Sequence, residues 1–175
     1  WTILMNPNIP FRDKETALKL SNAIKNEAKE NKHYKIMEVC GTHTMAIARS
    51  GLRSMLPSNV ELVSGPGCPV CVTSQGEIDL FFELIDKGVS VVSFGDLLRI
   101  PGSNGQSLMD KRAHGADVSV VYSPLDTIKL AKASPDKHYT FLGIGFETTA
   151  PTVAALIMQA KKENIKNLSV LSFCK

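Results

Sequence analysis

The chain has 175 residues, of which 43% are hydrophobic and 21% are charged, and its formal net charge is +3. The apolar content excludes an intrinsically disordered chain, and the 12 Gly and 9 Pro residues are too few for a collagen-like one. Lys and Glu are interspersed and no basic run is longer than two residues, so the charge pattern does not indicate nucleic-acid binding. No apolar run approaches the roughly 18 residues of a membrane span, and residues 1–15 lack the pattern of a signal peptide. We therefore expect a cytoplasmic protein that does not bind a membrane.

Short strand-like runs alternate with amphipathic helical stretches along the whole chain. In chain order we expect a helix over 13–31, a strand over 35–39, a helix over 44–56, a strand over 60–63, a helix over 75–86, a strand over 89–94, a helix over 108–114, a strand over 118–122, a helix over 125–133, a strand over 140–144, a helix over 152–163 and a strand over 168–173. This alternation predicts βαβ units, and hence an α/β fold with a mainly parallel, Rossmann-like sheet and helices on both faces.

The ends of the sequence and one internal seam predict its domain organisation. A seam near Tyr122-Ser123-Pro124 predicts a first α/β domain over residues 1–122 and a second over 123–175. The sequence begins with Trp1 rather than Met, and it ends at Lys175 directly after a strand-like run. Because a domain rarely stops where a buried strand has just finished, we expect a fragment of a larger protein, with the second domain incomplete.

Three loops that follow expected strands carry the unusual residues of the chain. They lie at 40–44 (Cys-Gly-Thr-His-Thr), 65–71 (Gly-Pro-Gly-Cys-Pro-Val-Cys) and 143–151 (Gly-Ile-Gly-Phe-Glu-Thr-Thr-Ala-Pro). Open parallel sheets bind their ligands at the carboxyl ends of the strands. We therefore expect the three loops to open together on one edge of one sheet.

Cys40 is expected directly after a strand and just before a helix. The helix dipole and the unbonded backbone N–H groups favour a thiolate there, which is the form that binds a metal or attacks an electrophile. Gly41 permits a tight turn, and His43 is near enough in sequence to ligate a metal or to hydrogen-bond the thiolate. The alternative is a buried cysteine that acts only as a small apolar residue. The neighbouring Gly, Thr and His favour a functional cysteine.

Cys68 and Cys71 form a C-x-x-C pair in a loop that two glycines and two prolines at 65–69 restrain. In a chain without a secretory signal, such a pair indicates redox or metal chemistry rather than a stabilising disulfide. A zinc ribbon needs a second pair, and Cys40 with His43 offers only a C-x-x-H at an unusual separation. A rigid turn with incidental cysteines is the alternative. Cys174 has no partner at a recognisable spacing, and we assign it no role.

The stretch at 143–149 superficially matches a dinucleotide-binding fingerprint. Thr148 stands where the third glycine would be, and no P-loop lysine is present, so phosphate binding is only weakly indicated. A buried Glu147 at the start of a helix would instead serve as an acid–base or hydrogen-bonding group. The alternative is a carboxylate that only caps the helix.

Five motifs together resemble the HypD family of hydrogenase maturation factors. They lie at 37–44 (Met-Glu-Val-Cys-Gly-Thr-His-Thr), 65–71 (Gly-Pro-Gly-Cys-Pro-Val-Cys), 94–103 (Phe-Gly-Asp-Leu-Leu-Arg-Ile-Pro-Gly-Ser), 121–126 (Val-Tyr-Ser-Pro-Leu-Asp) and 145–151 (Gly-Phe-Glu-Thr-Thr-Ala-Pro). The motifs occur in the family's order, and the resemblance extends from about residue 11 to residue 173.

The resemblance implies a scaffold on which the Fe(CN)2CO unit of [NiFe]-hydrogenases is built. In this family HypD pairs with the small chaperone HypC, the complex holds the iron, and HypE donates the cyanide. Cys40 matches the family cysteine that holds this iron together with HypC, and His43 matches the adjacent histidine. Cys68 and Cys71 match a redox-active pair that exchanges electrons with a [4Fe–4S] cluster, and Glu147 matches a glutamate near the cleft. The resemblance implies a maturation scaffold with redox activity rather than a conventional enzyme.

Two departures from the family limit what the resemblance implies. Met45 stands where the family often has a second histidine, so a ligand at that position is missing. The family binds its cluster through cysteines of a C-terminal portion that this sequence lacks, so none of its 4 cysteines is expected to be a cluster ligand. Two other functions stay open: a thiol–disulfide oxidoreductase that uses Cys68 and Cys71, and a binding module with a structural zinc held by these two cysteines, Cys40 and His43.

Overall fold

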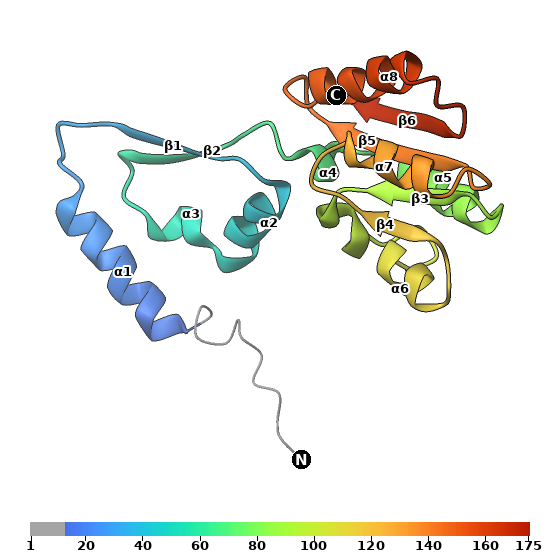
Figure 1. The fold of residues 1–175 in the computed structure, drawn as a ribbon. Coiled ribbons are helices and arrows are strands. Elements are labelled where there is room, and N and C mark those ends of the chain that lie inside the picture. The colour runs from blue at the N-terminus through green and yellow to red at the C-terminus, as the bar shows by residue number, and fades with distance from the viewer. Residues whose placement is uncertain (1–12) are drawn as a thin grey trace. The chain divides into compact units, whose positions relative to one another are not determined.

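The computed structural model describes residues 13–175 and divides into two compact units (Figure 1). The first unit ends at Cys68, and the second runs from Pro69 to Lys175. Residues 1–12 lie outside the described residues, and they include most of the N-terminal stretch that lacks a signal-peptide pattern. Within the described range, every helix is too short or too polar to cross a membrane.

The described part of the first unit pairs two parallel strands and places short helices around them. Its elements are α1 (Lys14–Glu27), β1 (Tyr34–Glu38), α2 (Gly41–Ser50), α3 (Leu52–Met55) and β2 (Val60–Ser64). The two strands pair in register from Tyr34 opposite Val60 to Glu38 opposite Ser64. Both strands therefore end at the same edge, and the loops that lead to Cys40 and to Cys68 begin side by side.

The single helix expected over 44–56 is two helices, separated at Gly51. Gly51 adopts the left-handed conformation, with φ 67°, and its N–H bonds back to the carbonyls of Ala48 and Ile47. This is the usual geometry of a glycine that ends a helix. Helix α2 consequently stops after Ser50, and the chain turns before β2.

The apolar side chains of α1 are largely uncovered. Leu18, Leu20 and Ile24 are 45%, 60% and 40% exposed. The buried residue of this helix is Ser21, whose hydroxyl donates a hydrogen bond of 2.6 Å to the carbonyl of Met55. The pattern of the sequence predicted the helix correctly, but within the described residues its apolar face contributes little to a core.

The second unit is a four-stranded parallel sheet with strand order β4-β3-β5-β6. Its elements are α4 (Pro69–Val72), α5 (Gln75–Asp86), β3 (Ser90–Ser93), the 3-10 helix η2 (Gly95–Arg99), α6 (Leu108–Ala113), β4 (Val118–Val120), α7 (Asp126–Ala133), β5 (Tyr139–Gly145), α8 (Ala150–Lys162) and β6 (Leu168–Cys174). Helix α5 has the bounds expected from the sequence, because the Ser74 hydroxyl and the Glu77 carboxylate cap its N-terminus reciprocally.

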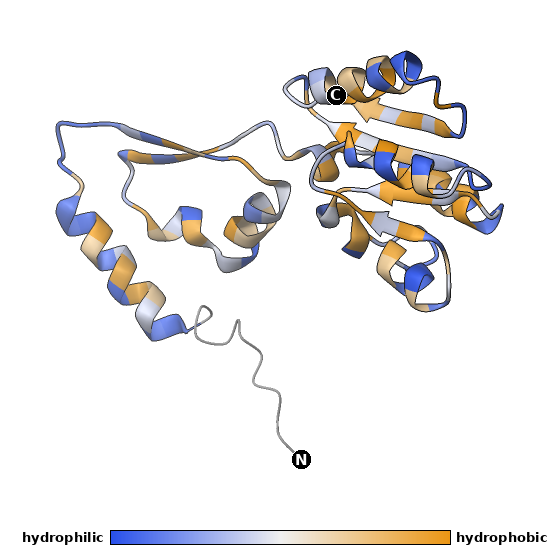
Figure 2. Ribbon diagram, in the orientation of Figure 1, coloured by the Kyte–Doolittle hydropathy of each residue, from blue (hydrophilic) through white to orange (hydrophobic). Residues whose placement is uncertain are grey.

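Helices cover both faces of this sheet. Neighbouring residues of a strand point to opposite faces, and the two core clusters divide in that way. Val91 and Leu142 pack on the face covered by α5, η2 and α6. Val92 and Phe141 pack on the face covered by α7 and α8. Hydrophobic residues, orange in Figure 2, recur along β3, β5 and β6, and the predicted α/β architecture with helices on both faces is confirmed.

The expectation of one sheet edge for all three motif loops is wrong, because the strands belong to two sheets. The loops at 40–44 and 65–71 follow β1 and β2, whereas the loop at 143–151 follows β5 of the other sheet. Hydrophobic periodicity predicts strands, but it does not predict which distant strands pair. The seam expected after Tyr122 falls inside the second unit, where β4 before it and β5 after it share a sheet.

Candidate functional site

The sulfur atoms of Cys40 and Cys68 lie 3.9 Å apart, although 28 residues separate them in sequence. Both side chains are half-buried. The parallel pairing of β1 and β2 explains the proximity, because each cysteine lies in the loop that follows one of these strands. The separation is well beyond the bond length of about 2.05 Å in a disulfide, so the two residues are neighbouring thiols.

Cys71 completes a group of three cysteines. Its sulfur and those of Cys40 and Cys68 all lie within 4.8 Å of one another. Cys71 follows Cys68 by three residues and stands on the short helix α4, so the chain itself keeps these two thiols close. Two thiolates bound at about 2.3 Å to one tetrahedral metal would be about 3.8 Å apart. The observed distance between Cys40 and Cys68 therefore suits a shared metal ion.

Cys40 stands at the N-cap of α2, as the sequence predicted. Its backbone is extended, with φ −129° and ψ 134°, and its carbonyl accepts hydrogen bonds from the N–H groups of His43 (2.8 Å) and Thr44 (3.2 Å). The sulfur lies 3.0 Å from the hydroxyl oxygen of Thr42. The positive end of the helix dipole and this hydroxyl both stabilise negative charge on the sulfur, which is the state that binds a metal.

Glu38 is a residue of this site that the sequence interpretation passed over. It is the last residue of β1, and its carboxylate accepts a hydrogen bond from the hydroxyl of Thr44 in the first turn of α2. The hydrogen bond from Thr44 is the main cause that lowers the pKa of Glu38 below its ordinary value, and the Ser64 side chain and the backbone N–H of Cys40 lower that pKa further. A carboxylate two residues before Cys40, at a strand end, was the signal in the sequence.

Gly65 brings the two strand ends into direct backbone contact. A Cβ atom at this position would lie 2.2 Å from the carbonyl oxygen of Glu38. Such a contact is far inside van der Waals distance, and a backbone carbonyl cannot rotate away as a side chain can. The absence of a side chain at Gly65 therefore permits the close approach of the loops that carry Cys40 and Cys68.

His43 and Met45 both lie on α2 with exposed side chains. His43 is not part of the three-cysteine group. Its ring is near enough to Glu38 to contribute, as the smallest of several causes, to the lowered pKa of that carboxyl group. The ligand role expected for His43 stays a prediction.

Glu147 is exposed, so the expectation that it is buried is wrong. It lies in the turn between β5 and α8, and its carbonyl accepts a hydrogen bond of 3.2 Å from the N–H of Ala150, where the helix begins. The tight turn depends on Gly145, where a Cβ atom would lie 2.4 Å from the Cβ of Thr149. A functional role for the Glu147 side chain stays a prediction.

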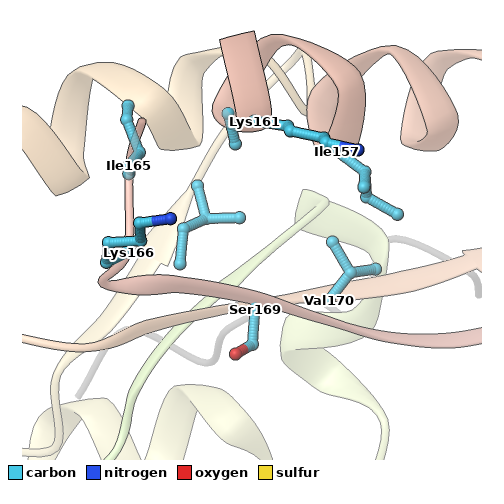
Figure 3. Close-up of a pocket in the computed structure, with 8 residues that line it drawn as sticks. Ile157, Lys161, Ile165, Lys166, Ser169 and Val170 are labelled. Atoms are coloured by element: carbon cyan, nitrogen blue, oxygen red, sulfur yellow. The ribbon is translucent and has the colours of Figure 1, made fainter. Parts of the chain in front are cut away.

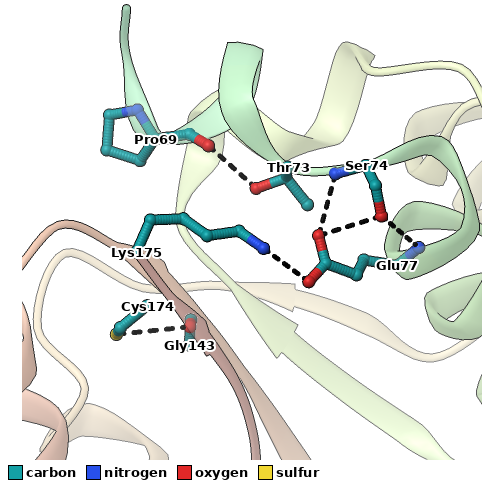
Figure 4. A network of polar contacts seen from close by, with 7 residues as sticks. All are labelled: Pro69, Thr73, Ser74, Glu77, Gly143, Cys174 and Lys175. Atoms are coloured by element: carbon teal, nitrogen blue, oxygen red, sulfur yellow. Dashed lines mark hydrogen bonds and ion pairs between the residues drawn. The ribbon is translucent and has the colours of Figure 1, made fainter. Parts of the chain in front are cut away.

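Cys174 is not a member of the three-cysteine group and is the last residue of β6 (Figure 4). Its thiol is 3.6 Å from the carbonyl oxygen of Gly143, and the next residue, Lys175, forms an ion pair of 2.6 Å with Glu77. A [4Fe–4S] cluster is held by four cysteine thiolates. Since this chain brings three of its 4 cysteines together, its own residues do not fit such a cluster.

A pocket of about 460 Å3 lies elsewhere on the second unit, between α8 and β6 (Figure 3). Aliphatic side chains, Ser169 and the two lysines Lys161 and Lys166 line it. None of the residues expected to carry chemistry belongs to this lining.

Comparison with known proteins agrees with the motifs. The family model described as "HypD: Hydrogenase formation hypA family" matches residues 15–175. Hydrogenase maturation factor HypD2 of Bradyrhizobium diazoefficiens is 48% identical over 165 residues, which are 94% of this chain and 43% of the relative. HypD of Cupriavidus necator is 45% identical over 92% of this chain and 43% of its own length, and HypD of Escherichia coli is 50% identical over 76% of this chain and 36% of its own. The chain thus spans less than half the length of these curated relatives, and by the extent of these matches it belongs to the HypD family.

Proposed function

We propose that this chain serves in hydrogenase maturation as part of a scaffold that holds an iron ion while the Fe(CN)2CO unit is assembled on it. The iron is the cargo of this process rather than a resident cofactor. The proposal depends chiefly on the 3.9 Å separation of the Cys40 and Cys68 sulfur atoms at the paired strand ends, because it brings the thiol assigned to iron next to a thiol of the proposed redox pair. Thiolates are soft ligands, and they suit an iron ion that carries cyanide and carbon monoxide.

Cys40 is the residue that we assign to iron binding, with His43 beside it. The Cys40 residue is half-buried, so part of it is open to a second protein. We propose that this second protein is a HypC chaperone and that HypE supplies the cyanide. Cys40 at a helix N-terminus offers a stabilised thiolate for the shared ion.

Cys68 and Cys71 are proposed as the redox pair of the site. Oxidation of the two thiols to a disulfide releases two electrons and two protons, so the pair can exchange two electrons in one reversible change. Glu147 is proposed as an acid–base group, and its side chain is exposed to solvent. The spacing of Cys68 and Cys71 within one turn favours formation of the disulfide without a large movement of the chain.

A structural zinc is a second candidate, and the sulfur separation favours it as well. Zinc in structural sites is tetrahedral and takes cysteine and histidine ligands. Cys40, Cys68 and Cys71 would be three ligands and His43 the fourth. Zinc would remain bound after purification in air, whereas the scaffold proposal requires Cys68 and Cys71 to be oxidisable.

Metal analysis of the complete gene product, purified with HypC without oxygen, distinguishes these functions. We expect iron to bind in a ratio near one to one, and Cys40→Ala to abolish that binding. Cys174→Ala is the matched control, since it removes a thiol outside the group, and it should bind iron as the parent does. Stoichiometric zinc in the parent protein, with no Cys68–Cys71 disulfide on oxidative titration, would reject the scaffold in favour of the zinc module.

A further inference from the structure

Glu38 makes contacts that no assigned role explains. It is an acidic residue at the carboxyl end of β1, half-buried, and it pairs in register with Ser64 at the end of β2. Both strand ends lead directly into the cysteine loops. A carboxylate offers two oxygen atoms with about four acceptor sites, so it can join several donors at once.

The groups around this carboxylate come from the three segments that frame the thiols. The backbone N–H of Cys40 belongs to the first cysteine loop, and the hydroxyl of Thr44 belongs to the first turn of α2. The Ser64 side chain belongs to the last residue of β2, four residues before Cys68. Hydrogen bonds to a charged acceptor are roughly twice as strong as neutral ones.

We propose that Glu38 is the positioning residue that fixes the Cys40 thiol against the Cys68 thiol. Its carboxylate accepts the hydrogen bond from Thr44 at the start of α2, and Glu38 is paired in register with Ser64 at the end of β2. Gly65, which has no side chain, lets the backbones of the two strand ends approach each other. In this role Glu38 acts through the placement of the loops. This inference rests on the proposed function only for its purpose, since the placement of two thiols is measurable without iron.

Dibromobimane, a short reagent that joins two neighbouring thiols, tests how close the Cys40 and Cys68 thiols lie. Cys71→Ala is the background, so that the linked pair is Cys40 with Cys68. Trypsin then yields the linked peptides 36–49 and 54–87, which mass spectrometry identifies. Rates are compared where each variant is fully folded, so that a loss of stability alone leaves them unchanged.

In this background we expect Glu38→Gln to slow the linking of Cys40 to Cys68 about tenfold. A glutamine keeps one acceptor oxygen but replaces the other with an NH2 group, which cannot accept a hydrogen bond. The loss of one charged hydrogen bond changes an equilibrium by about tenfold. Glu61→Gln is the matched control, because Glu61 lies on β2 with an exposed side chain that pairs with His33 and Lys35. The control should link at the parent rate.

If Glu38→Gln links Cys40 to Cys68 at the same rate as the parent, the inference is wrong. If Glu38→Gln does not fold, the double variant Thr44→Val/Ser64→Ala decides, since it removes two donors and keeps the carboxylate. Slower linking in that variant supports the positioning role, and a parent rate rejects it. Iron loading that is independent of Cys40 would reject the proposed function while leaving the linking result intact, so the two failures are distinguishable.

Discussion

A Cβ atom on Gly65 would lie 2.2 Å from the carbonyl oxygen of Glu38, so the ends of β1 and β2 meet backbone to backbone beneath the cysteine loops. This close approach allows Cys40 and Cys68 to be neighbours. The geometry of the thiols therefore depends on a residue that carries no functional group.

Replacement of Gly65 by alanine should separate the two cysteine loops. We expect Gly65→Ala to lower the free energy of unfolding by about 1–3 kcal/mol, the usual cost of overpacking. It should also slow the linking of Cys40 to Cys68 by a bifunctional thiol reagent. Gly76→Ala on α5 is the control, because a Cβ atom there meets nothing within 4 Å. Parent-like linking in Gly65→Ala would show that the strand ends can separate without moving the thiols.

The loop at 101–107 is anchored to α5 by Asp79. Its carboxylate accepts hydrogen bonds from the N–H (2.8 Å) and the hydroxyl (2.6 Å) of Ser103. We expect Asp79→Asn to raise the hydrogen-exchange rate of the Ser103 amide at least about tenfold, since the charged acceptor is lost. Glu83→Gln, which changes an exposed carboxylate on the same helix, should leave that amide protected. Unchanged exchange in Asp79→Asn would mean that packing alone holds the loop.

Asp117 should make the stability of the second unit depend on pH. Its carboxylate accepts hydrogen bonds of 2.8 Å from Lys137 and from Ser90, and chiefly the bond from Lys137 lowers the pKa of Asp117 below its ordinary value of 3.8. The pKa of Asp117 is lower in the folded protein than in the unfolded chain. The ionised carboxylate therefore stabilises the folded state fully above pH 3.8, and this stabilisation is lost as the pH falls from 3.8 through the folded pKa.

Denaturation of Asp117→Asn at several pH values tests this dependence. At neutral pH the variant should be less stable than the parent by about 1 kcal/mol, a modest value because the pair is partly exposed. The difference should shrink as the pH falls below 4, where the parent carboxylate becomes protonated. Asp136→Asn removes a charge next to Lys137 and is the control. A difference that stays constant down to pH 2 would exclude the carboxylate as its source.

The two units should differ in their resistance to local opening. All the described hydrophobic side chains that are buried belong to the second unit, whereas Ile36, Met37 and Val39 in or next to β1 are more than half exposed. Hydrogen exchange of this chain should therefore be faster in β1 than in β5, where every residue is buried. Equal protection of the two strands would show that the first unit has a core of its own.

Local signals in the sequence were sufficient for most elements of the fold. The apolar run of β5 is buried along its whole length, and the capping box of Ser74 and Glu77 fixes the start of α5. The C-x-x-C spacing and the position of Cys40 after a strand likewise predicted two parts of the cysteine site. These features depend on residues that are close together in sequence.

Long-range relationships could not be predicted in the same way. The division of the strands into two sheets depends on pairing between distant segments, so the loop with Glu147 was wrongly assigned to the edge that carries Cys40. The exposure of Glu147 depends on the conformation of the turn after β5, and the identity of the residue does not determine that conformation. Glu38 was missed because a glutamate at a strand end is typical of a solvated position, and its donors lie 2, 6 and 26 residues away.

In the proposed function the Cys40 thiolate holds the iron on which the Fe(CN)2CO unit is built. Infrared spectroscopy of the complete gene product, isolated without oxygen in complex with HypC, tests it most directly. We predict cyanide and carbon monoxide stretching bands in the parent and in Cys174→Ala, and their loss together with the iron in Cys40→Ala. Undiminished bands and iron content in Cys40→Ala would contradict the account.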